Sequence, residues 1–96
     1  MKVVIKKSTK PKYKYTATFT ENGKKVKTTS FGSAGMNDYT LTGDKDARKR
    51  YRARHKRDLR TGDFKRAGFL SYYVLWGDST SISKNIEDYK KRFNLR

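Results

Sequence analysis

The 96-residue sequence contains no cysteine and only one histidine, His55. Without thiols the chain has no disulfide, no thiolate nucleophile and no cysteine zinc site. A single histidine also removes most of the metal sites and acid–base pairs on which enzymes depend. We therefore expect a protein with no enzymatic activity, no metal and no cofactor.

Long apolar runs are missing as well. The best stretch, residues 67–76, has about half of the roughly 20 residues that a membrane-spanning helix needs, and it includes Ser71, Tyr72 and Tyr73. Met1 is followed directly by a strand-like segment, without the charged start and apolar core of a signal peptide. We expect no transmembrane segment and no secretion.

Acidic residues are scarce: nine Asp and Glu stand against 25 Lys and Arg, so the net charge is +16 and the pI is near 10.3. This balance favours nucleic acid, an anionic membrane surface or an acidic protein as partner, and the membrane is the weakest of the three. The aromatic residues (seven Tyr, five Phe and one Trp) are spread along the chain, which indicates a folded domain and not a disordered tail.

Residues 2–31 predict a three-stranded antiparallel sheet. An apolar stretch flanked by lysines forms a first strand at the start of the chain, and aromatic and polar residues then alternate up to Thr20. Asn22-Gly23 follows, a pair that suits a type I′ hairpin turn because both residues must adopt positive φ. This turn would place Phe19 opposite Val26 and Glu21 opposite Lys24, with one aromatic face and one face of Lys and Thr.

The rest of the chain predicts about three helices packed on that sheet. Residues 32–43 read as a structured loop, and helices are expected over residues 44–60, 67–76 and 80–93. The second of these is apolar on more than one face and belongs in the core. We therefore predict one α+β domain over residues 1–96, with a small antiparallel sheet against helices.

The expected helix over residues 44–60 is the most basic element. Thr42 or Asp44 would cap it, and Asp38 in the preceding loop could pair with one of its arginines. Between Lys45 and Arg60 it has nine Lys or Arg and two Asp, while Ala47, Tyr51, His55 and Leu59 form one narrow stripe. We expect Tyr51 and His55 on that stripe to pack against the protein. The cations would cover most of the remaining circumference.

These cations are candidates for binding nucleic acid. Arginine presents a planar fork that suits phosphate oxygens, and the helix has no Asn or Gln to read adenine, so we expect phosphate contacts without base reading. A solvated face that keeps the protein soluble is the alternative. The candidate residues are Lys45, Arg48, Lys49, Arg50, Arg52, Arg54, Lys56, Arg57 and Arg60, with Lys14, Lys25 and Lys27 of the hairpin.

Other features give weaker signals. Tyr72, Tyr73 and Trp76 could stack on bases, but their position predicts the core, with only Tyr72 facing outward. The glycines of residues 31–40 match no phosphate-binding motif and indicate a tight turn. The carboxylates are scattered, and a nuclease that uses one of them is a minor alternative.

Five segments together resemble a family of small basic proteins of unassigned function from large nucleocytoplasmic DNA viruses, including chlorella-infecting viruses and mimivirus relatives. They are KVVIKKS (2–8), FGSAGMNDYT (31–40), RYRARHKRD (50–58), AGFLSYYVLWG (67–77) and KNIEDYKKRF (84–93). The resemblance covers nearly the whole chain and implies a viral setting but no catalytic residue. Those relatives have a Trp just beyond the arginine-rich stretch, where this chain has only Leu59 and Phe64 as large apolar residues.

A viral setting yields two hypotheses. The first is a protein that binds double-stranded DNA without sequence preference and neutralises its phosphates during genome packaging. The second is a minor capsid or cement-type protein whose cations contact acidic patches on capsid proteins. Either role implies a location in the virion, the infected-cell nucleus or a cytoplasmic viral factory.

Overall fold

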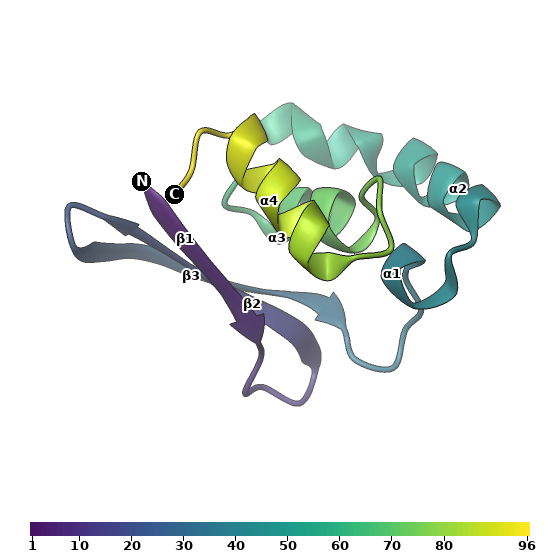
Figure 1. Ribbon diagram of the computed structural model, residues 1–96, viewed down its shortest axis with the longest axis horizontal. Coiled ribbons are helices and arrows are strands. Elements are labelled where there is room, and N and C mark those ends of the chain that lie inside the picture. Colours follow the sequence, from purple (N-terminus) through teal and green to yellow (C-terminus); the bar gives the residue numbers. More distant parts are fainter.

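A computed structural model describes residues 1–96 and shows an α+β fold, as predicted. An antiparallel sheet in the order β1-β2-β3 is followed by helical elements, all on one side of the sheet (Figure 1). The strands are β1 (Lys2–Lys7), β2 (Tyr13–Glu21) and β3 (Lys24–Ser33). The helical elements are α1 (Tyr39–Thr42), α2 (Lys45–His55), the 3₁₀ segment η1 (Lys56–Thr61), α3 (Ala67–Leu70), the π-helical η2 (Ser71–Leu75) and α4 (Ile82–Arg92).

The hairpin turn forms at the predicted place. Asn22 and Gly23 adopt φ angles of 52° and 77°, and Glu21 pairs with Lys24. The predicted pairing of Phe19 with Val26 is wrong, because the register shifts between Phe19 and Thr20. The bulge places Lys27 opposite Phe19 and leaves Val26 51% exposed. Beyond the bulge, the β3 side chains that face the core are the ones predicted to face away from it.

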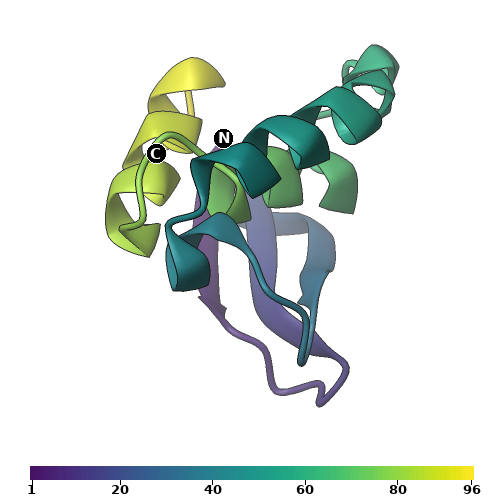
Figure 2. The ribbon, with the colours of Figure 1, turned by 90° about the vertical axis from the view of Figure 1, so that its right-hand side faces the viewer.

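The core lies between one face of the sheet and the helices that cover it. Figure 2 shows these helices as a layer on one side of the strands. The buried apolar residues are Val3, Ala17, Phe19, Phe31, Leu70, Val74, Leu75, Tyr89 and Leu95. The other face of the sheet has no helix on it, so the fold has one covered and one uncovered sheet face.

Two predicted helices change type along their length. The basic helix expected over residues 44–60 is α-helical only to His55 and continues as 3₁₀ η1 to Thr61. The core helix expected over residues 67–76 widens into η2, where the Trp76 N–H donates to the carbonyl of Ser71, five residues earlier. The C-terminal helix has the expected position, with Ser81 as its N-cap.

The segment expected as a loop over residues 32–43 contains one helical turn, α1. Asp38 caps this turn by accepting a hydrogen bond from the Thr40 N–H at 2.8 Å. The expected pairing of Asp38 with an arginine of the next helix is wrong, because its buried carboxylate pairs with the Lys14 ammonium at 2.5 Å. The physical reason is burial: a carboxylate that is 2% exposed needs a charged partner within reach, and β2 supplies it.

The end of the chain closes against its start. The Val3 N–H donates to the Arg96 carbonyl and the Arg96 N–H donates to the Met1 carbonyl, each at 3.1 Å, so Arg96 covers the outer edge of β1 (Figure 1).

No helix of this chain has the length and apolar character that crossing a bilayer requires.

Candidate nucleic-acid interface

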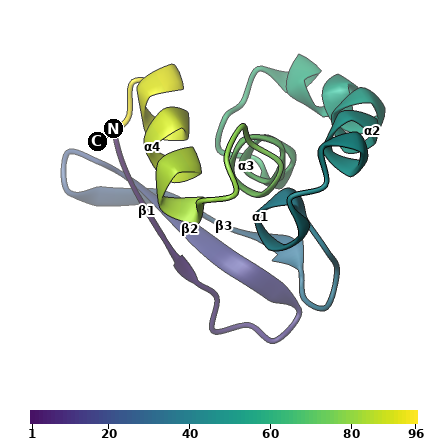
Figure 3. The ribbon, with the colours of Figure 1, turned by 45° about the vertical axis from the view of Figure 1, so that its right-hand side comes forward.

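The basic helix α2 occupies the outside of the helical layer. Asp44 caps it by accepting a hydrogen bond from the Ala47 N–H at 3.0 Å, and its carboxylate complements the positive end of the helix. Figure 3 shows α3 end-on, with the sheet on one side of it and α2 on the other. The helix therefore presents one side to the protein and leaves the other side free.

Arg52 lies on the inner side and joins α2 to the end of η2. Its Nε donates to the Trp76 carbonyl at 2.8 Å, and its terminal nitrogen contacts the Asp78 carboxylate at 3.0 Å. The guanidinium carbon lies 5.7 Å from the centre of the Tyr72 ring. The hydrogen bond from Arg52 lowers the pKa of Asp78. Two of the three guanidinium nitrogens of Arg52 therefore have a partner within the chain.

Arg48 binds the same region one helical turn earlier. It donates to the carbonyls of Gly77 at 3.3 Å and Asp78 at 3.2 Å, and its guanidinium carbon lies 4.5 Å from the Tyr39 ring centre. The carbonyl that Arg52 binds belongs to Trp76, the C-cap of η2, and the two that Arg48 binds lie just beyond it. Both arginines therefore place positive charge at the negative end of the helix dipole.

An aromatic stack completes the inner side. The Tyr51 ring lies parallel to Trp76, with centres 4.4 Å apart and an 8° angle, and His55 stacks on Tyr51 with centres 4.2 Å apart. Burial raises the pKa of Tyr51. His55 also contacts the Asp58 carboxylate at 3.0 Å. The expectation of packing against the protein is confirmed for Tyr51, whereas His55 packs on the Tyr51 ring and keeps 40% of its side chain exposed.

The outer side of α2 and η1 has a different character. Its cations are exposed, and none of them forms an ion pair with an acidic side chain. We call these residues the outer basic surface: Lys45, Lys49, Arg50, Arg54, Lys56, Arg57 and Arg60. Four of them, with Ala53 and Leu59, line an open groove of about 570 Å³. No carboxylate lies in that groove.

The structure thus divides the predicted site residues. Arg48 and Arg52 are engaged inside the protein, and Lys14 is held by Asp38. Lys27 lies opposite Phe19, on the covered side of the sheet, where its charge adds to the Lys65 hydrogen bonds that lower the pKa of Asp63. Lys25 lies opposite Thr20 on the uncovered face, away from the outer basic surface. The helix cations and the hairpin lysines therefore do not form one site.

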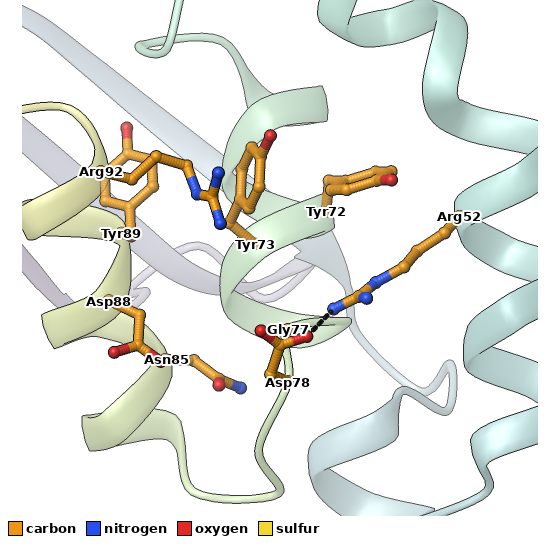
Figure 4. Close-up of a pocket in the computed structure, with 9 residues that line it drawn as sticks. All are labelled: Arg52, Tyr72, Tyr73, Gly77, Asp78, Asn85, Asp88, Tyr89 and Arg92. Atoms are coloured by element: carbon orange, nitrogen blue, oxygen red, sulfur yellow. Dashed lines mark hydrogen bonds and ion pairs between the residues drawn. The ribbon is translucent and has the colours of Figure 1, made fainter.

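A polar cavity of about 250 Å³ lies between α2, η2 and α4 (Figure 4). Arg52 and Arg92 enter it, but Arg52 is paired with Asp78, and the Arg92 guanidinium carbon lies 4.7 Å from the Tyr73 ring centre. Tyr72, which was expected to face outward, is half-buried at its wall. Because Asp78 and Asp88 offset the two arginines, this cavity attracts a polyanion less than the outer groove does.

Two cations of the uncovered sheet face were absent from the predicted site. Lys2 and Lys6 lie on β1 opposite Thr20 and Thr16, on the same side as the threonines of β2. Extending the alternation of Lys and Thr from the hairpin into the first strand would have found them.

Comparison with known proteins gives one match. No curated protein matches the chain, and neither does any solved structure. A family model matches residues 3–55, which contain most of the sheet and all of α1 and α2. The match extends over more than half of the chain, and the protein therefore belongs to the family of unknown function DUF5754.

Proposed function

We propose that this protein binds double-stranded DNA without sequence preference, through the outer basic surface of α2 and η1. The observation that carries the proposal is the difference between the two sides of α2. Arg48 and Arg52 have partners within the chain, whereas the seven outer cations have none. Exposed positive charges that lie close together and have no acidic partner attract a polyanion.

The chemistry of the surface favours phosphate over bases. Its groove presents the side chains of Arg54, Lys56, Arg57 and Arg60 without an acceptor among them. Arginine forks bind phosphate oxygens with two parallel hydrogen bonds, and lysine acts as a point charge. Side chains that pair with base edges by shape, Asn and Gln, are missing from α2 and η1. Binding of this kind follows charge density and not sequence.

The resemblance to small basic viral proteins gives this activity a setting. A confined DNA genome needs its phosphates neutralised, and a small protein with a net charge of +16 would contribute to that. A minor capsid or cement-type role, with acidic protein surfaces as partners, would use the same cations. The two roles differ in which polyanion binds more tightly.

The test reverses the charge of three outer residues. In the variant Arg50→Glu/Arg54→Glu/Arg57→Glu we expect the affinity for unrelated duplexes to fall about 100-fold or more at 0.1 M salt, because each lost phosphate contact removes roughly 0.9 from the salt slope. The matched control is Lys84→Glu/Lys91→Glu/Arg96→Glu, which has the same net charge but leaves α2 and η1 unchanged. Circular dichroism would show that both variants are folded.

The control decides what the loss means. We expect the control to retain most of the wild-type affinity, since its changes lie away from the outer basic surface. Equal losses in the two variants would show that only net charge matters and would contradict a defined interface. Unchanged DNA binding in the α2 variant, with lost binding to an acidic polypeptide, would favour the capsid role.

A further inference from the structure

The uncovered face of the sheet is a second cationic surface. Lys2 and Lys6 project from β1 beside Thr16, Thr18 and Thr20 of β2, as the register of the two strands requires. Together with Lys7 they line a shallow hollow of about 430 Å³. No acidic residue lines this hollow.

We propose that this face binds a second segment of DNA, so that one molecule bridges two duplexes. The inference rests on the proposed function, because it assigns the first duplex to the outer basic surface. It adds a second site, of the same ligand class, built from lysine and threonine.

The spacing of the cations suits an extended phosphate backbone. Lys2 and Lys25 both flank Thr20 across the three strands, which separates their Cα positions by about 10 Å. Lys2 and Lys6 are four residues apart on β1, or roughly 13 Å. The hydroxyls of Thr18 and Thr20 between these ammonium groups are further donors for phosphate oxygens. The face thus offers donors in two directions across an area that a duplex backbone can cover.

The same composition argues against a protein on this face. Protein interfaces depend on buried aromatic or aliphatic anchors, and the only apolar residue in the hollow is Val4, which is 38% exposed. A second copy of this chain would bring like charge to like charge. Phosphates need no apolar anchor, so DNA is the partner that this surface fits.

The two basic surfaces lie on different sides of the molecule. Figures 1 and 3 show the uncovered sheet face turned away from the helices, and α2 beyond α3 on the far side. Residues 1–37 contain nine Lys and one Glu, and residues 38–96 contain 16 Lys and Arg against eight Asp and Glu, so each part carries a net charge of +8. Two duplexes bound in this way would be separated by the thickness of the protein and would not compete for one surface.

A bridging assay tests the inference. One duplex is fixed to beads, a fluorescent duplex of unrelated sequence is in solution, and the protein is titrated at 0.1 M salt. We expect wild type to capture the second duplex with a maximum at intermediate protein concentration, because excess protein fills each duplex separately. The variant Lys2→Glu/Lys6→Glu/Lys25→Glu should reduce capture at least about ten-fold while keeping the salt slope for a single duplex.

The controls separate failure of this inference from failure of the proposed function. A Gln version of the same three changes serves if the Glu version does not fold, and sedimentation velocity establishes whether the free protein is a monomer. If wild type binds DNA without bridging, the proposal of a second site is wrong and the first site is unaffected. The same holds if the sheet variant bridges two duplexes as well as wild type does. Bridging by a dimer, or preferential binding of an acidic polypeptide to the sheet face, would also overturn it. Absence of any DNA binding would overturn both.

Discussion

The two sides of α2 carry the same kind of residue and serve different ends. On the inner side, Arg52 donates to the Trp76 carbonyl at 2.8 Å and contacts Asp78 at 3.0 Å. On the outer side, Arg54 is exposed, and no acidic side chain pairs with it. Two arginines that are only two positions apart on one helix therefore differ in role: Arg52 is bound within the protein, and Arg54 has a charge that is free to bind a ligand.

This difference shows that the surroundings, and not the arginine count, define the binding surface. Carbonyl groups at the C-cap of η2 and just beyond it accept hydrogen bonds from Arg48 and Arg52 of the neighbouring α2. Cations directed at those carbonyls lose their availability for a ligand. The remaining cations gain no partner from the fold and keep their charge for solvent or a polyanion.

The largest effect on stability is expected where the inner side meets η2. A Cβ at Gly77 would lie 2.2 Å from the Tyr73 carbonyl oxygen, so Gly77→Ala must move backbone that also receives Arg48. We expect a loss of about 3 kcal/mol in the free energy of unfolding, measured with urea. Gly35→Ala, at a position with open space and positive φ, should cost only about 1 kcal/mol. Equal costs would contradict tight packing at Gly77.

Arg52→Ala and Arg54→Ala should affect stability and DNA binding in opposite order. Arg52→Ala should lower the free energy of unfolding by about 2 kcal/mol, because it removes charge-assisted hydrogen bonds and leaves the Trp76 carbonyl without its donor. Arg54→Ala should change it by less than about 0.5 kcal/mol. DNA affinity should follow the reverse order in the folded proteins, since only Arg54 is free to contact phosphate.

Urea titrations and binding isotherms on both single variants would check this pair of expectations. If Arg52→Ala left stability unchanged, the inner hydrogen bonds would not hold α2 in place. If both variants lost DNA affinity equally while folded, the division of α2 into two sides would be wrong.

The smallest effect concerns pH. Hydrogen bonding lowers the pKa of Asp78, chiefly through the Arg52 guanidinium, and that of Asp63, chiefly through the Lys65 N–H. Because both carboxylates are more acidic in the folded chain, their contribution is present above the unfolded pKa of about 3.9 and is lost as the pH falls below it. Asp78 is 76% exposed, so its share should be well under 1 kcal/mol.

Thermal unfolding between pH 2.5 and 6 would test the Asp78 contribution. The variant Asp78→Asn should be slightly less stable than wild type above about pH 5 and converge with it toward pH 2.5, so that its acid limb is slightly flatter. A variant whose stability curve is parallel to that of wild type throughout this range would show that the Arg52–Asp78 pair contributes nothing.

Local chemistry made several elements predictable. The Asn22-Gly23 turn and the inward placement of Tyr51 follow from short-range patterns that the structure bears out, and of the two predicted caps, Thr42 and Asp44, the structure uses Asp44. The fold class follows from strands that precede helices. These features depend on residues within a few positions of each other.

Features that depend on distant partners were not predictable. The bulge after Phe19 changes which side of β3 is buried, and no local pattern marks it. The inward turn of Arg48 depends on carbonyls at Gly77 and Asp78, which lie beyond α3 in the chain. Helical periodicity separates apolar from charged residues, and it therefore placed every arginine of α2 on the outside.

The most direct test of the central claim is a salt titration of the purified protein with unrelated duplexes, single strands and an acidic polypeptide. If the outer basic surface contacts about six phosphates, log K should fall with log salt at a slope near −5 for every duplex, and the polypeptide should bind clearly more weakly. Binding that disappears below about 0.15 M salt, or equal affinity for the polypeptide, would contradict DNA as the ligand of this surface.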